Sequence, residues 1–159
     1  MKRNKVCFLG FAVCIIALFS VSCGGGKPTE IKVVFPNHTW NRFMPMDATF
    51  EITNVKKTYE VAVRLSVING FELDNVPFEM VITSPDGQQN IVNRTFVVKK
   101  DGNYLGTVFG DVWTTELVVY QAKQFSQAGT YSIVIQNRTQ YYELYKTESL
   151  SFIVRPAKK

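Results

Sequence analysis

The feature that most constrains the fold is a two-residue alternation of side chains over residues 59–67. Odd positions from Tyr59 to Val67 are large and apolar, whereas even positions are charged or small, as at Glu60 and Arg64. Successive side chains of a β-strand point to opposite faces, so this pattern predicts a strand with one face in a core. Residues 131–136 and 150–155 are similar runs, rich in the β-branched and aromatic residues that favour strands.

Turn-forming residues separate these runs. Ser84-Pro85-Asp86-Gly87 combines a proline that presets φ with a glycine that accepts positive φ, and Lys100-Asp101-Gly102-Asn103 repeats the Asp-Gly signal. The sequence predicts an all-β fold, a single antiparallel β-sandwich of about eight strands with immunoglobulin-like or jelly-roll-like connections. The predicted strands cover residues 31–35, 49–53, 59–68, 78–83, 91–98, 104–109, 131–136 and 150–155. Residues 114–125 fit either a strand or a helical turn.

A different pattern occupies the N-terminus. Three basic residues among the first five precede an apolar stretch over residues 6–21, and small residues surround Cys23. This order is typical of a bacterial lipoprotein signal, in which the cysteine thiol accepts diacylglycerol and the cysteine becomes the first residue after cleavage. An uncut signal anchor is the alternative, but roughly 17 apolar or small residues barely span a hydrocarbon core of about 30 Å.

The N-terminal pattern divides the chain into three parts. We predict a lipoprotein signal peptide over residues 1–22, a lipidated Cys23 with a flexible tether over residues 23–30, and the sandwich over residues 31–159. The three cysteines, of which two lie in the signal and one carries lipid, then leave no thiol for a disulfide, a zinc site or a nucleophile.

Charge gives no indication of nucleic-acid binding. The whole chain has a formal net charge of +5, from 18 basic and 13 acidic residues, but three of the basic residues would leave with the signal. The remaining lysines and arginines are scattered and form no basic stripe. We therefore expect a membrane contact through acyl chains on Cys23 and no nucleic-acid partner.

No arrangement of residues predicts catalysis. His38 is the only histidine, and no Gly-x-Ser-x-Gly elbow supplies a nucleophile for it. In His38-Thr39-Trp40 we expect a structural role, with the imidazole bonded to backbone and the indole filling one end of the core. Asp86, Asp101 and Asp111 each stand beside or near glycine, as turn aspartates do. We predict no catalytic residue, no metal and no cofactor.

The segment Tyr141-Tyr142-Glu143-Leu144-Tyr145 is the most suggestive group of aromatic residues. Adjacent side chains on a strand point to opposite faces, so at least one of Tyr141 and Tyr142 is expected to be exposed. Exposed tyrosine is favoured at protein interfaces and in sites that stack sugars. Tyr141, Tyr142 and Tyr145 are therefore candidate partner-binding residues, and a plain edge strand is an equal alternative.

Several short motifs occur along the chain in an order that resembles the gliding-motility lipoprotein GldH family of Bacteroidetes. They contain His38, Trp40, Arg64, Asp101, Gly102 and Arg138, and they extend from His38-Thr39-Trp40 through Gly129-Thr130-Tyr131 to Gln136-Asn137-Arg138. The resemblance implies an envelope lipoprotein that acts in motility or secretion machinery, without catalytic residues to carry over.

The sequence is compatible with two different functions. The first is a non-enzymatic, lipid-anchored envelope protein that binds partner proteins, and the second is a carbohydrate-binding envelope lipoprotein. Residues 24–28 are Gly-Gly-Gly-Lys-Pro and lack the acidic stretch expected of surface-exported lipoproteins in these bacteria. We therefore expect the domain to face the periplasm.

Overall fold

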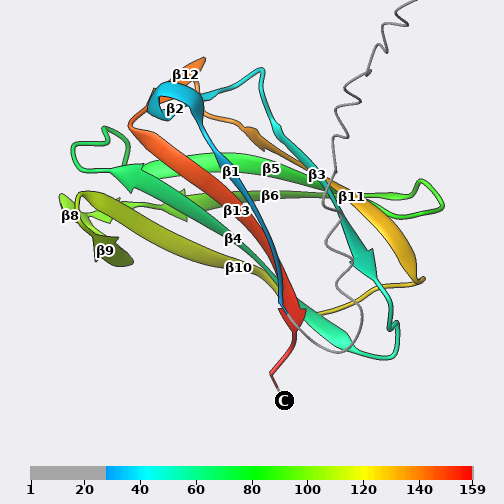
Figure 1. Cartoon of the computed structure of the whole chain (residues 1–159). Coiled ribbons are helices and arrows are strands. Elements are labelled where there is room, and N and C mark those ends of the chain that lie inside the picture. The colour runs from blue at the N-terminus through cyan, green and yellow to red at the C-terminus, as the bar shows by residue number, and fades with distance from the viewer. Residues whose placement is uncertain (1–27, 159) are drawn as a thin grey trace, which may run out of the picture.

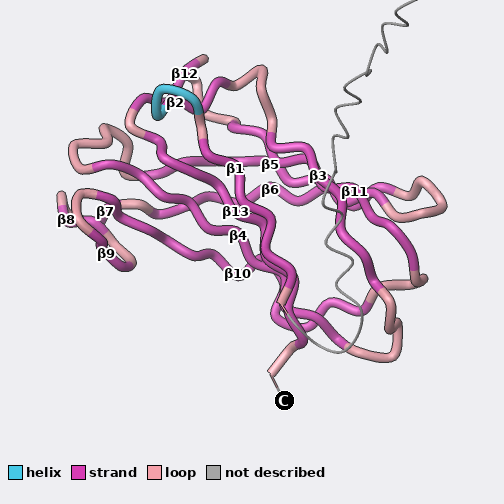
Figure 2. The backbone as a smooth tube through the Cα atoms, viewed as in Figure 1, coloured by secondary structure: helices cyan, strands magenta, loops and turns pink. Residues whose placement is uncertain are grey.

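The computed structural model describes residues 28–158, which form antiparallel β-sheets with one short 3-10 turn, η1 (Pro36–His38) (Figures 1 and 2). A five-stranded sheet has the order β1 (Thr29–Val34), β13 (Thr147–Pro156), β4 (Thr58–Ile68), β10 (Val112–Gln124), β9 (Thr107–Phe109). A four-stranded sheet has the order β3 (Met46–Ile52), β11 (Gly129–Asn137), β5 (Asn75–Thr83), β6 (Gln89–Val97). Two small pairs complete the fold, β12 (Glu143–Tyr145) with β2 (Thr39–Asn41) and β7 (Lys99–Lys100) with β8 (Asn103–Tyr104).

The two larger sheets pack face to face around one core, which confirms the predicted sandwich. The alternation on β4 has the predicted result, because Val61, Val63, Leu65 and Val67 are all buried in that core. Phe152 on β13 packs against Phe50 on β3, with ring centroids 5.0 Å apart, and so joins the two sheets. Burial of these apolar side chains is the main force that holds the layers together.

Two aspartate turns form as the sequence predicts. The Asp86 carboxylate accepts a hydrogen bond from the Ser84 hydroxyl at 2.5 Å and one from the Gln88 amide at 3.3 Å, so it closes the hairpin between β5 and β6. Both bonds lower the pKa of Asp86, and the bond from the Ser84 hydroxyl has the larger effect. Asp101 and Gly102 both have positive φ, 51° and 77°, and turn the chain between β7 and β8.

The prediction of one strand over residues 104–109 is wrong. The chain forms β8 and β9 there, interrupted at Leu105 and Gly106. Gly106 has a φ of 88°, and a Cβ on it would lie 2.1 Å from the carbonyl oxygen of Thr114. The backbone therefore bends at a residue without a side chain, where it passes against β10.

Residues 114–125, undecided from the sequence, belong largely to β10, so the helical-turn alternative is wrong. β10 pairs with β4, and its register shifts between Val118 and Tyr120 and again between Tyr120 and Lys123. Such irregularities interrupt the two-residue period, because an extra residue reverses the faces that follow it. That interruption makes the segment look ambiguous in the sequence.

The two ends of the sandwich have different neighbours. At one end Thr29, the first residue of β1, pairs with Val154 near the C-terminus. β2 and β12 lie at the opposite end, away from the C-terminus (Figure 1).

The predicted signal peptide, Cys23 and most of the predicted tether lie outside the described residues. Strand β1 begins at Thr29, within the last part of that tether. Residues 28–158 contain no helix with the length and apolar character needed to span a bilayer.

Candidate partner-binding surface

The candidate tyrosines follow a loop that a buried amide holds in place. Asn137, at the end of β11, is fully buried, and its side-chain oxygen accepts a hydrogen bond from the Thr139 amide at 2.8 Å. The Thr139 hydroxyl in turn accepts one from the Tyr141 amide at 3.3 Å. These two bonds hold the path of the loop, although the buried side-chain nitrogen of Asn137 has no hydrogen-bond partner among the described residues.

Tyr141 and Tyr142 are not on a strand, which corrects the expectation that they point to opposite faces. They precede β12, and both are exposed, at 47% and 65% of their surface. β12 covers only Glu143 to Tyr145, where Leu144 pairs with Trp40 of β2 and is buried. The short strand directs Leu144 into the core and leaves Tyr145 66% exposed.

A second segment brings an aromatic residue that the sequence analysis missed. Directly after β2, the Arg42 amide donates a hydrogen bond to the Tyr142 carbonyl at 2.7 Å. This bond places Phe43 beside Tyr142, and the two rings stack with centroids 5.6 Å apart and an interplanar angle of 23°. Phe43 is 71% exposed and Met44 64%. No periodic pattern marks these two residues in the sequence, because they lie in a turn.

Together these residues form what we call the aromatic surface, defined as Phe43, Met44, Tyr141, Tyr142 and Tyr145. They come from two segments about 100 residues apart in the chain that β2 and β12 hold together. Isolated exposed apolar residues are normal on proteins, but clustered ones that include stacked rings indicate an interaction site. The Tyr145 hydroxyl donates to the Glu143 carboxylate at 2.5 Å, and this bond raises the pKa of Tyr145.

The motif residues His38 and Trp40 separate in the structure. Trp40 is fully buried and stacks on Phe35, with centroids 5.3 Å apart, so it fills one end of the core as predicted. The predicted backbone partner of His38 is wrong, since Nδ1 of its exposed imidazole contacts the Glu148 carboxylate at 2.5 Å. His38 adopts a φ of 51° in the η1 turn, and its side chain is exposed.

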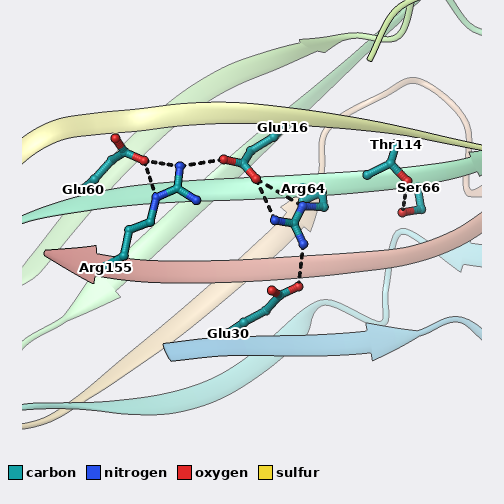
Figure 3. A network of polar contacts seen from close by, with 7 residues as sticks. All are labelled: Glu30, Glu60, Arg64, Ser66, Thr114, Glu116 and Arg155. Atoms are coloured by element: carbon teal, nitrogen blue, oxygen red, sulfur yellow. Dashed lines mark hydrogen bonds and ion pairs between the residues drawn. The ribbon is translucent and has the colours of Figure 1, made fainter. Parts of the chain in front are cut away.

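Arg64 is the centre of an ion-pair network on the outer face of the five-stranded sheet (Figure 3). Its guanidinium donates to Glu116 at 2.7 Å and to Glu30 at 2.8 Å. The second oxygen of Glu116 accepts from Arg155 at 2.8 Å, and Arg155 also donates to Glu60 at 2.7 Å. Four strands, β1, β4, β10 and β13, therefore contribute to one network.

The network shifts the pKa of Glu116 and that of Arg64. Partial burial alone would raise the pKa of Glu116, but hydrogen bonds and charge from Arg64 and Arg155 outweigh it and lower that pKa. The hydrogen bond to Glu116 raises the pKa of Arg64. Among the other motif residues, Arg138 pairs with Glu79 at 2.6 Å, and Asp101 and Gly102 form the turn described above. Within residues 28–158, no three His, Cys, Asp or Glu side chains gather as a metal-ligand set.

Comparison with known proteins identifies a family. A family model described as GldH lipoprotein matches residues 29–153. Among solved structures, the VP2 subviral particle of infectious bursal disease virus gives a TM-score of 0.34 at 13% identity, over 84% of this chain and 34% of the viral one. The structure of the Gt strain of the same virus gives a TM-score of 0.33 at 14% identity, over 97% of this chain and 42% of the chain from the Gt strain. The chain thus spans less than half of these viral chains. Curated proteins give no match.

Proposed function

The chain belongs to the GldH lipoprotein family, and we propose that it is a non-enzymatic, lipid-anchored envelope protein that binds a protein of the motility or secretion machinery. Cys23 would carry the lipid, and the domain would face the periplasm. The observation that supports partner binding most directly is the aromatic surface, whose five exposed side chains come from two segments next to the paired strands β2 and β12 and include the stacked rings of Phe43 and Tyr142.

The position of the aromatic surface suits a lipid-anchored protein. Cys23 lies six residues before Thr29 in the sequence, and Thr29 is at the end of the sandwich opposite β2 and β12. A membrane anchor at Cys23 would therefore leave the aromatic surface directed away from the bilayer. A partner could reach it without displacing the domain from the membrane.

The chemistry of the aromatic surface suits a protein partner. Interfaces draw most of their binding energy from a few central residues, among which tyrosine is enriched, and methionine and phenylalanine are also common at interface cores. Tyr142 is the best anchor candidate, because it is exposed and its ring already stacks against that of Phe43. Ordering before binding reduces the entropy lost on association.

The test is a Tyr142→Ala variant of the full chain, isolated with its envelope partner from the host in mild detergent. Loss of a central aromatic anchor commonly costs about 2 kcal/mol, so the dissociation constant for the purified partner should rise about 30-fold. The melting temperature should change little, since Tyr142 is exposed. Affinity is read by titration, and stability by thermal unfolding.

Phe109→Ala is the matched control. Phe109 is 91% exposed on β9, outside the aromatic surface, so its loss removes an exposed aromatic ring of similar size. Partner affinity should stay at the wild-type value in this variant. Equal losses from Tyr142→Ala and Phe109→Ala would contradict the assignment. Saturable binding of a neutral polysaccharide, abolished by Tyr142→Ala, would replace the protein partner with a carbohydrate at this surface.

A further inference from the structure

The outer face of the five-stranded sheet carries a polar groove of about 620 Å³. Its lining consists of charged, serine and threonine side chains together with Gly106, and it includes no aliphatic or aromatic side chain. The volume lies within the range of about 300–1,000 Å³ that is usual for small-ligand sites, but such sites are mostly apolar. A groove of this composition suits a ligand that presents many hydrogen-bonding groups.

The strand register explains how the groove forms. Ser151 of β13 lies between Lys32 of β1 and Arg64 of β4, and Glu116 of β10 follows Arg64 in the same row. In the neighbouring row, Ser149, Ser66, Thr114 and Thr107 lie side by side on four strands. Small hydroxyl side chains thus occupy the centre of the sheet, while longer charged ones stand beside them (Figure 3).

The floor of the groove offers hydroxyl groups. The Ser66 hydroxyl bonds that of Thr114 at 3.0 Å. Ser149 and Ser151 are only 2% and 3% exposed, but both line the groove, and their hydroxyls have no hydrogen-bond partner among residues 28–158. A hydroxyl both donates and accepts, so these serines can bond the hydroxyls of a ligand in either direction.

Some of the charged side chains that line the groove are paired with one another, and one is not. Arg64 makes three hydrogen bonds, two to Glu116 and one to Glu30, which fix its guanidinium and leave two of its five donors for a ligand. Lys32 is exposed, lines the groove, and has no ion pair with a described residue. Lys32 is therefore the groove's uncommitted positive charge, next to fixed donors and acceptors.

We propose that this groove binds an acidic saccharide, with sugar hydroxyls over Ser149, Ser151 and Arg64 and an acidic group at Lys32. A peptide fits less well. The central strands β13 and β4 are paired on both sides, so they offer no free edge for backbone pairing, and the groove has no apolar pocket for a side-chain anchor. The proposal does not depend on the aromatic surface or on its partner.

The test is titration of the full chain, in detergent, with an alginate hexasaccharide, which is built of uronic acids. Saturable binding is expected, at least tenfold tighter than binding of neutral maltohexaose or of a hexaglutamate peptide. Weak or no binding of alginate, or equal binding of maltohexaose, would overturn the proposal. Equal binding of hexaglutamate would show that only charge is recognised and would overturn it as well.

Two variants locate the binding. Lys32→Glu should weaken alginate binding at least tenfold, whereas Lys100→Glu, the same charge change at an exposed residue of β7 outside the groove, should not. Ser151→Val removes one floor hydroxyl while keeping a residue that favours strands, and should weaken binding several-fold. Unchanged affinity in both Lys32→Glu and Ser151→Val would overturn the site. Tyr142→Ala should bind alginate as wild type does, which separates this test from that of the protein partner.

Discussion

At the scale of single residues, Gly106 has the tightest surroundings of the glycines in the described chain. It bends the backbone between β8 and β9 at positive φ while its Cα lies against the backbone of β10. Its lack of a side chain is needed twice, for the backbone conformation and for the close approach. Gly106 also lines the polar groove, so one residue shapes both the sheet edge and the proposed site.

We predict that Gly106→Ala destabilises the protein more than Gly102→Ala. Both glycines have positive φ, so alanine at either should cost about 1–2 kcal/mol of conformational strain. Only at Gly106 would the new Cβ meet backbone atoms, with the Thr114 oxygen at 2.1 Å, whereas at Gly102 nothing lies within 4 Å. Chemical denaturation should show at least about 1 kcal/mol of additional loss for Gly106→Ala. Equal losses would contradict the close approach.

Single residues also show where sequence reasoning succeeds and where it stops. Trp40 could be placed in the core, because a large apolar side chain beside a strand has few other stable positions. The position of His38 could not, because its exposure depends on a positive φ and on Glu148, which is 110 residues away in the chain. Phe43 was missed for the same reason, since its neighbour Tyr142 comes from a distant segment.

At the scale of elements, the ion-pair network connects four strands across the outer face of one sheet. Exposed ion pairs usually contribute only about 0–1 kcal/mol each, but a shared carboxylate couples several of them. Glu116 is that shared group, with one oxygen to Arg64 and the other to Arg155. Its protonation should therefore weaken the contacts among β10, β4 and β13 together.

We predict that this network makes stability depend on pH in the acid range. The folded pKa of Glu116 is lowered, so the contribution of Glu116 to the free energy of unfolding is complete above the ordinary glutamate value, about 4.3. That contribution falls as the pH drops through the folded pKa. Glu116→Gln should therefore be less stable than wild type at pH 7, and the gap should close in urea titrations below about pH 4.3.

Glu72→Gln is the control for this pH dependence. Glu72 is exposed and lies outside the network. The same loss of charge should therefore leave the free energy of unfolding near the wild-type value both at pH 7 and below about pH 4.3. A gap between wild type and Glu116→Gln that keeps the same size from pH 7 to pH 3 would contradict the network's role.

Elements with a regular period were predictable, and those shaped by distant contacts were not. β4 was recognised almost to its ends, because one of its faces is in the core throughout. β10 was ambiguous because its register shifts interrupt the alternation. β2 and β12 were missed because three-residue strands have too few positions to show a period, and each forms only through its pairing with the other.

At the scale of the whole molecule, the start of β1, which is the part of the sandwich nearest to Cys23 in the sequence, lies at the end opposite the aromatic surface. The sequence alone could suggest the anchor from Cys23 and the partner from the tyrosines, but not their relative positions. Those positions follow from the pairing of Thr29 with Val154 and from the location of β2 and β12 at the other end. The polar groove also required the strand register, because its residues come from five different strands.

We predict that Cys23→Ala releases the protein from the membrane. Each buried methylene of an acyl chain adds about 0.8 kcal/mol to membrane binding, so several chains hold a protein firmly while the variant would lack them. Fractionation of host cells should find wild type in the membrane pellet and the Cys23→Ala variant in the aqueous fraction or still uncleaved. An unmodified Cys23 in wild-type protein recovered from the aqueous fraction would disprove the anchor.

In the living cell, we expect the aromatic surface to bind an envelope protein. The most direct measurement places a photo-crosslinking amino acid at position 142, or at position 109 as control, and identifies the products by mass spectrometry after irradiation of host cells. We predict one reproducible crosslinked envelope protein from position 142 and none in common from position 109. The same products from both positions, or none from position 142 in cells with normal amounts of the protein, would contradict it.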